Sequence, residues 1–279
     1  MICSIVVLYE NEEKELEHIN DYSEMVDKIF VIDNSKRTNK KKIEKILYEN
    51  DCIEKLEFFH FPENIGLCCA LNFGMEKAHE YGCEWALIMD ADSSFLNNIV
   101  KIYLGFLNQS IYADIAVLAP VHIFDRGKNK TYEGFKQCKW AMTSGCFYNI
   151  SIFIQLGGFK EELYVDGLDI DYGYRANKNG YKIIQVGNAK LNHHPGTTHV
   201  LKIGSRELVK YGYATPYRYY MQARALIWVI FKYRQLSDVL RYFYKWFKVL
   251  FLFDSKKEYI KQLLEGTKEG IKLWKNEKK

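Results

Sequence analysis

Two carboxylates stand one residue apart directly after a short apolar run in the first half of the chain. The run Trp85–Met89 has the length and composition of a buried strand, and Asp90 and Asp92 follow it. In open α/β sheets, ligands bind outside the carboxyl ends of the strands, and Mg2+ or Mn2+ is held by carboxylates together with substrate phosphates. The pair therefore predicts a site for a divalent metal and a diphosphate. The structural alternative is that Asp92 or Ser93 only caps the next helix. This alternative stays open because Asp-x-Asp is common by chance.

Two earlier segments are predicted to be strands that end close to this pair. Ile2–Tyr9 stops at Glu10, and Lys28–Ile32 stops at Asp33. Residues 63–74 then lead from a loop into a helix, and their small side chains would let a ligand approach the backbone closely. We therefore expect three strand ends of one sheet to converge on a nucleotide.

Each of these strand ends offers side chains for a nucleotide. Asp33 would accept a hydrogen bond from a base imide or a ribose hydroxyl, and Tyr9 would offer main-chain contacts and a ring edge. Asn64 and Gly66 would line the base and ribose side, and Asp90 would meet the ribose or order its loop. Taken singly, each is equally explained as a turn residue. The predicted nucleotide-sugar residues are Tyr9, Glu10, Asp33, Asn64, Gly66, Asp90 and Asp92.

Eight short segments follow one another in a fixed order along the first two hundred residues. They are Val6–Glu10, Val31–Ser35, Glu63–Gly66, Met89–Asp92, Thr143–Gly145, Gly157–Phe159, Asp166–Arg175 and His193–Gly196. Together they resemble glycosyltransferase family 2, most closely its bacterial rhamnosyltransferase-like branch, and a helix with Arg-Tyr-Tyr at 218–220 also looks like one found in that branch. The resemblance implies a GT-A fold: an α/β, Rossmann-like, mostly parallel central sheet with flanking helices, plus a C-terminal helical extension.

The resemblance also implies an inverting sugar transfer that needs a carboxylate base. In the family, the base is the Asp of an acidic pair, often Glu-Asp, that opens a helix whose motif ends in Arg. Aligned on Arg175, that position is Asp169, and Leu168 stands where the Glu would be. Asp166 and Asp171 remain alternatives. Asp171 is spaced to pair with Arg175 along a helix, while Asp166 would contact the acceptor or cap the helix.

The resemblance supplies further metal and acceptor contacts. Asp92 would bind Mn2+ or Mg2+, and the family spacing of a His before Gly maps to His193 before Gly196. His194 is the competing ligand, and a lone histidine is more often structural. Gly145 resembles the acceptor-side floor, where a sugar approaches the backbone.

By resemblance, the first expectation for the donor is dTDP-rhamnose, with galactofuranose, galactose, glucose or an acetylated aminosugar as alternatives. The acceptor would be a saccharide or lipid-linked saccharide in the synthesis of a cell-surface polysaccharide such as a capsule. Two other classes compete. A haloacid-type phosphatase also uses Asp-x-Asp, but Ser93 follows here and two strand-helix units precede it. A non-catalytic carbohydrate-binding protein is disfavoured because Asp90, Asp92, Asp169 and His193 are all present.

Composition sets broad limits on partners and location. The 279 residues are 48% hydrophobic, which is enough for a full α/β core, and the net charge of +4 is too small to argue for nucleic acid. Seven cysteines without a Cys-x-x-Cys pair suggest neither a disulfide framework nor a zinc site. The first residues predict a core strand rather than a signal peptide, and the later apolar runs are too short to span a membrane. We therefore expect a cytoplasmic protein.

The strand and helix alternation stops soon after Gly196, so we predict a catalytic domain over 1–204 and a helical extension over 205–279. The nucleotide-sugar half would cover about 1–115 and the acceptor half about 116–204. From Arg241 onward there are eleven Lys or Arg against five Asp or Glu, a balance of +6. Basic helices with aromatic side chains bind anionic membrane surfaces, so we expect peripheral contact with the cytoplasmic face of a membrane. The alternative is that the aromatic residues pack on the catalytic domain or form a homodimer through the C-terminal helices. They are Trp228, Phe231, Tyr233, Tyr242, Phe243, Tyr244, Trp246, Phe247, Phe251 and Phe253.

Overall fold

The computed structural model describes residues 1–109, 113–126, 132–193, 196–203 and 205–277. The chain divides into two compact units, and each is described by itself. The predicted boundary at residue 204 stays a prediction. The first unit comprises Met1–Phe124, Lys128–Tyr164 and Tyr172–His194, and the second comprises Asp125–Gly127, Val165–Asp171 and Pro195–Lys279.

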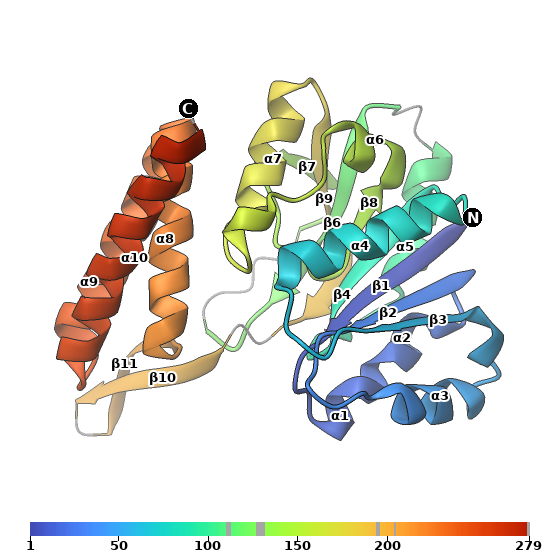
Figure 1. The fold of residues 1–279 in the computed structure, drawn as a ribbon, viewed down its shortest axis with the longest axis horizontal. Coiled ribbons are helices and arrows are strands. Elements are labelled where there is room, and N and C mark those ends of the chain that lie inside the picture. The colour runs from blue at the N-terminus through green and yellow to red at the C-terminus, as the bar shows by residue number, and fades with distance from the viewer. Residues whose placement is uncertain (110–112, 127–131, 194–195, 204, 278–279) are drawn as a thin grey trace. The chain divides into compact units, whose positions relative to one another are not determined.

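The first unit is built around a sheet of nine strands in the described residues (Figure 1). Eight of them follow the order β3-β2-β1-β4-β8-β6-β9-β5, and β7 pairs with β9 off this path. The strands are β1 (Ile2–Leu8), β2 (Lys28–Asp33), β3 (Leu56–His60), β4 (Trp85–Asp90), β5 (Ser94–Phe95), β6 (Ile115–Ile123), β7 (Phe135–Cys138), β8 (Cys146–Asn149) and β9 (Lys182–Asn192).

The half of the sheet formed by β3, β2, β1 and β4 is entirely parallel, in line with the mostly parallel sheet that the resemblance implied, although β3 itself was not predicted. Its register aligns the strand ends: Leu8 pairs with Asp33, and Val7 pairs with Asp90. Strands β1, β2 and β4 are largely apolar and buried because helices cover parallel sheets on both faces, whereas the edge strand β3 is half-exposed. The predicted convergence of the first, second and fourth strands at one edge is therefore confirmed.

The other half of the sheet is mixed. β8 runs antiparallel to both β4 and β6, whereas β6 and β9 are parallel. The short strands β5 and β7 both pair antiparallel with β9. The sequence did not predict β5, because two residues are too few to show a periodic pattern.

Helices of the first unit cover the sheet, and α4 packs closely on it. A Cβ added at Gly74 of α4 would lie 2.7 Å from Ile5 of β1, so the glycine lets the helix approach the strand. Fully burying a side chain such as Ile5 contributes about 1.5–3 kcal/mol. The helices are α1 (Glu13–Leu16), η1 (Glu17–Ile19), α2 (Asn20–Ser23), α3 (Lys40–Tyr48), η2 (Ile53–Lys55), α4 (Leu67–Glu80), α5 (Ile99–Gln109), α6 (Ile150–Gln155), η3 (Glu161–Leu163) and α7 (Leu168–Lys178), whose first four residues belong to the second unit.

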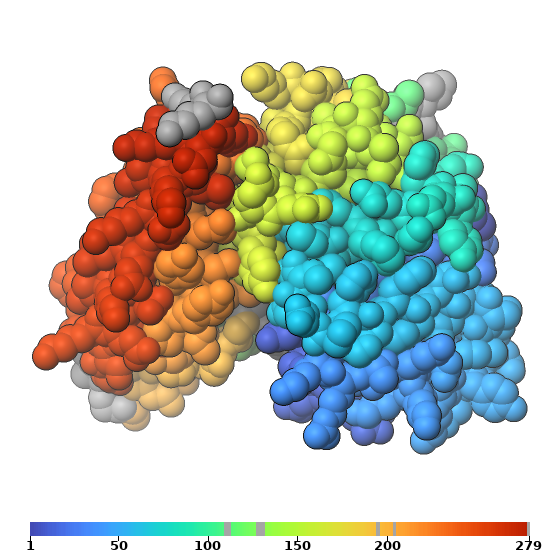
Figure 2. Space-filling model, viewed as in Figure 1, coloured from blue at the N-terminus to red at the C-terminus, as the bar shows by residue number. Residues whose placement is uncertain are grey.

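The second unit joins an antiparallel hairpin to three helices that run side by side (Figure 1). In Figure 2, side chains of α8 in orange and α10 in red form one packed surface. Gly266 and Gly270 of α10 make this contact close, because a Cβ at Gly270 would collide with the Arg224 carbonyl of α8. The elements are β10 (Thr197–Ile203), β11 (Arg206–Tyr213), α8 (Pro216–Tyr233), α9 (Leu236–Leu252) and α10 (Lys256–Glu277).

Helix α9 turns its large apolar side chains outward. Its inner side buries Asp238, Lys248 and Val249, while Phe243 is 62% and Phe251 67% exposed. The predicted aromatic set is therefore split, because Trp228 and Phe253 are buried in the unit. Within the described residues, no helix is both long enough and apolar enough to span a bilayer. The exposed apolar residues, called the α9 stripe below, are Leu236, Leu240, Phe243, Tyr244, Phe247, Leu250 and Phe251.

Candidate active site

Three predicted residues of the first unit come together: Asp90, Asp92 and His193 each offer one ligand atom, and these atoms all lie within 4.8 Å of one another. Asp90 ends β4, and His193 directly follows β9. Strand β5 explains the meeting, because it follows Asp92 closely in sequence and pairs Ser94 with Asn192 of β9. Carboxylate oxygens with an imidazole nitrogen form a donor set that suits Mn2+ and can accept Mg2+. These side chains therefore fit a divalent cation.

The His193 ring is held in place from behind. The Ser93 hydroxyl lies 2.8 Å from His193 Nδ1, and the His193 amide donates to the Ile123 carbonyl at 3.2 Å. Partners of this kind orient a metal-binding histidine and fix its tautomer. His194, the competing ligand, lies outside the described residues.

A second histidine packs beside the site. The rings of His122 and His193 lie edge to face with centroids 5.7 Å apart. Burial lowers the pKa of His122 to about 4, although its hydrogen bond with the Ser144 carbonyl at 2.7 Å opposes this. At neutral pH the ring is uncharged, so Nε2 carries the hydrogen that it donates to Ser144. His122 therefore adds no positive charge beside a cation.

The segment before β8 supports the loop that carries the carboxylates. The Ser144 hydroxyl accepts a hydrogen bond from the Asp90 amide at 3.1 Å, and the Gly145 amide donates to the Ile88 carbonyl at 2.8 Å. Gly145 has φ of +74°, and a Cβ there would lie 2.9 Å from Leu191. Glycine is therefore required for packing at this position, and its predicted contact with the acceptor stays a prediction.

Asp33 and Glu10 organise the loops that follow β2 and β1. Asp33 is fully buried, and its carboxylate accepts from the amides of Asn39 at 2.7 Å and Ser35 at 3.1 Å. The Glu10 amide donates to the Ser35 hydroxyl, and the Glu10 carboxylate accepts from the Lys36 amide at 2.8 Å. These bonds join the two strand-end loops into one structure. Direct contact of either carboxylate with a nucleotide stays a prediction.

Three more predicted nucleotide residues lie in loops of the first unit. Tyr9 directly follows β1, and Asn64 and Gly66 lie in the loop that leads into α4. Tyr9 is largely exposed, and Asn64 Oδ1 accepts from the Gly66 amide at 2.9 Å. Gly66 has φ of +87°, and a Cβ there would lie 2.6 Å from the Tyr164 ring. Only glycine fits this turn without displacing Tyr164. The nucleotide contacts of these three residues also stay predictions.

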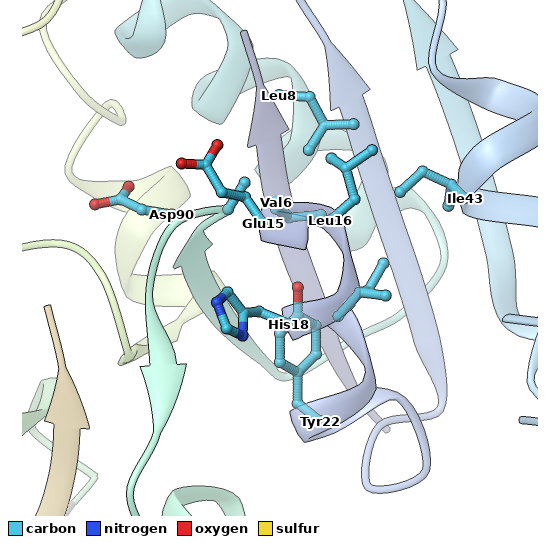
Figure 3. Close-up of a pocket in the computed structure, with 10 residues that line it drawn as sticks. Val6, Leu8, Glu15, Leu16, His18, Tyr22, Ile43 and Asp90 are labelled. Carbon is cyan, nitrogen blue, oxygen red and sulfur yellow. The ribbon is translucent and has the colours of Figure 1, made fainter. Parts of the chain in front are cut away.

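Asp90 borders a small, partly open hollow between β1 and the helices α1 to α3. Figure 3 shows Asp90 at one edge of this pocket and Leu8, Leu16 and Ile43 on the opposite side. His18 and Tyr22 also line it. Asp90 thus lies at the border of this partly apolar hollow, and its carboxylate points away from Leu8, Leu16 and Ile43.

The candidate base, Asp169, belongs to the second unit and lies at the start of α7. Its Oδ1 accepts from the Ile170 amide at 2.9 Å. Burial raises the pKa of Asp169 to about 7; Asp166 adds to this effect, while the Ile170 amide and Arg241 oppose it. A carboxylate with this pKa can accept a proton near neutral pH and remain a stronger base than an ordinary Asp.

The two alternatives to Asp169 are engaged in ion pairs within the second unit. Asp166 meets the guanidinium of Arg218 at 3.1 Å, and burial still raises the pKa of Asp166. Asp171 is fully buried and lies 3.4 Å from the ammonium of Lys232. In the first unit, the Arg175 guanidinium donates to the carbonyls of Leu156 and Gly158. The structure thus gives both Asp171 and Arg175 structural contacts that spacing alone did not predict.

The chain is similar to known proteins in both sequence and structure. The chain is 26% identical over 212 residues to the dTDP-rhamnosyl transferase RfbF of Shigella flexneri, covering 69% of this chain and 68% of that protein. It also resembles the structure of GalNAc-T7 with UDP, GalNAc and Mn2+ at a TM-score of 0.60 and 13% identity, covering 97% of this chain but only 56% of that one. The structure of S. aureus TarS 1-349 in complex with UDP-GlcNAc matches at a TM-score of 0.60 and 16% identity, covering 95% and 80%. No family model matches the chain.

The chain is a glycosyltransferase with the GT-A fold. The resemblance identified in the sequence is confirmed at this level, including the C-terminal helices. Sequence reasoning missed two side chains of the site, Ser93 as the partner of His193 and His122 as its neighbour. A polar residue near the carboxyl end of the apolar segment 115–123 was the available signal for His122. No pattern in the sequence could have paired Ser93 with a residue one hundred positions away.

Proposed function

We propose that this glycosyltransferase is a metal-dependent inverting enzyme that uses a nucleoside-diphosphate sugar. The observation that carries the proposal is the convergence of Asp90, Asp92 and His193 at the carboxyl ends of the strands. A cation there would be held by Asp92 and His193, with Asp90 beside them. When bound, Mn2+ or Mg2+ supplies Lewis-acid neutralisation of the charge that develops on the leaving diphosphate.

Asp169 is proposed as the general base. Its carboxylate would take the proton from an acceptor hydroxyl while that oxygen forms a bond to the anomeric carbon of the donor sugar. The bond between the anomeric carbon and the diphosphate oxygen breaks on the opposite side, so the configuration inverts. A pKa of about 7 leaves much of Asp169 ionised at neutral pH, which this role requires.

The first proposed donor is dTDP-rhamnose, supported by the name of the Shigella flexneri relative. Galactofuranosyl, galactosyl, glucosyl and aminosugar transfer remain the alternatives, and UDP-GlcNAc in TarS supports keeping the last of these. The proposed acceptor is a saccharide or lipid-linked saccharide in cell-surface polysaccharide synthesis, such as capsule formation. A saccharide acceptor fits the general chemistry of the enzyme class.

A donor panel with Mn2+ tests the proposal through release of the nucleoside diphosphate. We expect the nucleoside diphosphate to be released from dTDP-rhamnose, and this release should stop in chelator and in the Asp92→Ala variant. As a control, Asp51→Ala removes an exposed loop carboxylate outside the cluster and should behave like the parent chain. A phosphatase of the haloacid type would instead release inorganic phosphate from phosphate esters without an acceptor. Donor binding without any release would indicate a non-catalytic carbohydrate-binding protein. Either outcome would contradict the proposal.

We further propose that the α9 stripe attaches the enzyme to the surface of an anionic membrane. Contiguous exposed apolar patches on soluble proteins mark contact surfaces, and the stripe occupies one face of a whole helix. Exposed lysines such as Lys261 and Lys272 lie on the adjacent α10. Two copies with a balance of +6 from Arg241 onward would repel each other, whereas an anionic surface attracts this charge.

Co-sedimentation with vesicles of phosphatidylglycerol and phosphatidylcholine in equal parts tests this attachment. The double variant Phe243→Ser with Phe247→Ser should remain in the supernatant. The control Tyr48→Ser removes an even more exposed aromatic side chain from α3 in the first unit and should sediment like the parent chain. A parent chain that elutes as a dimer and ignores the vesicles would support the homodimer instead.

A further inference from the structure

Two lysines on the inner side of α9, the buried Lys248 and the partly buried Lys245, have ammonium groups with neutral hydrogen-bond partners. Lys245 Nζ donates to Gln222 Oε1 at 2.5 Å, and Lys248, which is 8% exposed, donates to the Gly212 carbonyl at 3.0 Å. Within the described residues, no carboxylate oxygen lies within 4.0 Å of either ammonium. Burial lowers the pKa of Lys245 to about 8 and that of Lys248 to about 7. Lysine is rarely buried without a charged partner, because an unpaired ammonium loses its hydration.

These two lysines are close neighbours. Both ammonium groups lie over the ring of Tyr219, at 5.4 Å for Lys245 and 5.3 Å for Lys248. The positive charge of Lys245 also contributes to the lowered pKa of Lys248. A shared aromatic face stabilises a cation, but it does not supply the negative charge that two adjacent ammonium groups would favour.

Three arginines surround the lysines in the same unit. The Asp166 carboxylate raises the pKa of Lys245, whereas Arg218 and Arg241 lower it. Arg126 lowers the pKa of Lys248. The guanidinium of Arg126 lies so close to Gly212 that a Cβ there would collide with it. Arg218 and Arg241 are 44% and 40% exposed, so an ion can reach this group from solvent.

The acids of this region are already bound to particular cations. Asp166 pairs with Arg218, Asp238 lies 3.6 Å from Arg241, and Asp125 lies 3.8 Å from Arg126. The two lysines are therefore the cations of the group that are left with neutral partners. An amphipathic helix in water normally buries its apolar side, whereas α9 buries Lys248, partly buries Lys245 and exposes the α9 stripe. Keeping these lysine ammonium groups away from water costs hydration free energy, and an anion bound among the lysines and arginines would offset that cost.

We propose that Arg126, Arg218, Arg241, Lys245 and Lys248, the cationic cluster, bind a phosphate or diphosphate group of the acceptor. Arg and Lys bind phosphate through charge-assisted hydrogen bonds. The proposal rests on the proposed function for its link to catalysis, because Asp169 of the same unit is the candidate base and Arg241 acts on it electrostatically. The phosphate could belong to a lipid diphosphate that carries the saccharide or to a phosphorylated saccharide.

Calorimetric titration with inorganic pyrophosphate in chelator tests the cluster. Chelator removes metal-bridged binding at Asp92, so the remaining binding reports the cluster. The intact chain should bind pyrophosphate, and Lys245→Gln with Lys248→Gln should weaken this binding at least about tenfold. The control Lys268→Gln with Lys272→Gln removes the same charge from the surface of α10 and should bind like the parent.

Several outcomes would overturn the proposal. They are an intact chain that does not bind pyrophosphate, a cluster variant that binds like the parent, and a control that loses binding equally. Asp92→Ala must also leave binding in chelator unchanged. Pyrophosphate binding is measured without donor, metal or turnover. The proposal for the cationic cluster and the proposed function can therefore be refuted independently of each other. Thermal unfolding checks folding, and the single variant Lys245→Met serves if the double variant does not fold.

Steady-state kinetics then distinguish the two sources of phosphate. A short-chain prenyl diphosphate saccharide and a soluble saccharide phosphate are compared as acceptors. The double lysine variant should raise KM for the acceptor whose phosphate the cluster binds, and leave KM for the nucleotide sugar unchanged. Unchanged KM values for both acceptors would contradict a role in acceptor binding.

Discussion

Replacing Asp169 by Asn should make the enzyme more stable at alkaline pH while removing its turnover. The native carboxyl has a pKa of about 7 instead of the ordinary 3.8, chiefly because it is buried. At about 1.4 kcal/mol per pKa unit, this shift corresponds to roughly 4 kcal/mol of stability that the native chain lacks when Asp169 is ionised. Asn has nearly the same size and carries no charge, so the variant avoids this loss.

The sign of the effect fixes its pH dependence. Below pH 3.8 the carboxyl is protonated in both the folded and the unfolded chain, so Asp and Asn should differ little. Between about pH 4 and pH 7 the unfolded chain is ionised and the folded chain is not, so the parent loses stability as pH rises. Above about pH 7 both states are ionised, and the advantage of Asn should reach its plateau.

Urea unfolding of the parent and Asp169→Asn at pH 5 and pH 8 measures this difference. Turnover should fall by about 100- to 10,000-fold with donor binding nearly unchanged, because the variant lacks the base but keeps the metal ligands. Asp166→Asn is the comparison that tests the assignment of the base, because it removes the carboxylate partner of Arg218 and leaves Asp169 in place. Near-normal turnover of Asp169→Asn together with inactive Asp166→Asn would make Asp166 the base. A stability difference independent of pH would refute the argument from burial.

Three further outcomes are expected. Asp92→Ala should abolish Mn2+ binding measured by electron paramagnetic resonance. Ser93→Ala should weaken this binding about 10- to 100-fold, because it removes the hydrogen-bond partner of the His193 ring. Unchanged Mn2+ affinity in both variants would place the metal elsewhere. Gly66→Ala should lose about 1–3 kcal/mol in thermal unfolding, because φ is +87° and its Cβ would press on Tyr164; an unaltered melting temperature would contradict this. The value of kcat/KM should decline as pH drops below about 7, where Asp169 takes up a proton, and a flat profile from pH 5 to 8 would argue against it as the base.

Periodicity was sufficient for three of the four strands in the parallel half of the sheet, and β3 was not predicted. Strands β1, β2 and β4 are apolar runs that end in polar residues, so their ends could be predicted together with the edge at which they meet. The carboxylates Asp90 and Asp92 follow directly from that prediction. His193 required the family resemblance, because nothing local distinguishes it from a structural histidine.

The remaining features depend on contacts between distant residues. Strand β5 has two residues, yet its pairing with β9 brings His193 to Ser93. Asp33 could be placed at the end of β2, but its hydrogen bonds with the Asn39 loop depend on how that loop folds back. Local patterns cannot report either contact, because both arise when segments far apart in sequence pack together.

Charge counting shows the same limit in the C-terminal helices. The balance of +6 from Arg241 onward treats every lysine as a fully charged surface group. Lys248 is instead buried and Lys245 partly buried, and their pKa values of about 7 and about 8 mean that both lose charge as pH rises through this range. Their ammonium groups also point inward, away from any surface that the exposed side of α9 contacts. If the α9 stripe binds a membrane, the apolar side chains must contribute more of the attachment than the net charge suggests. Raised salt should then weaken the attachment without abolishing it, whereas loss of Phe243 and Phe247 should abolish it.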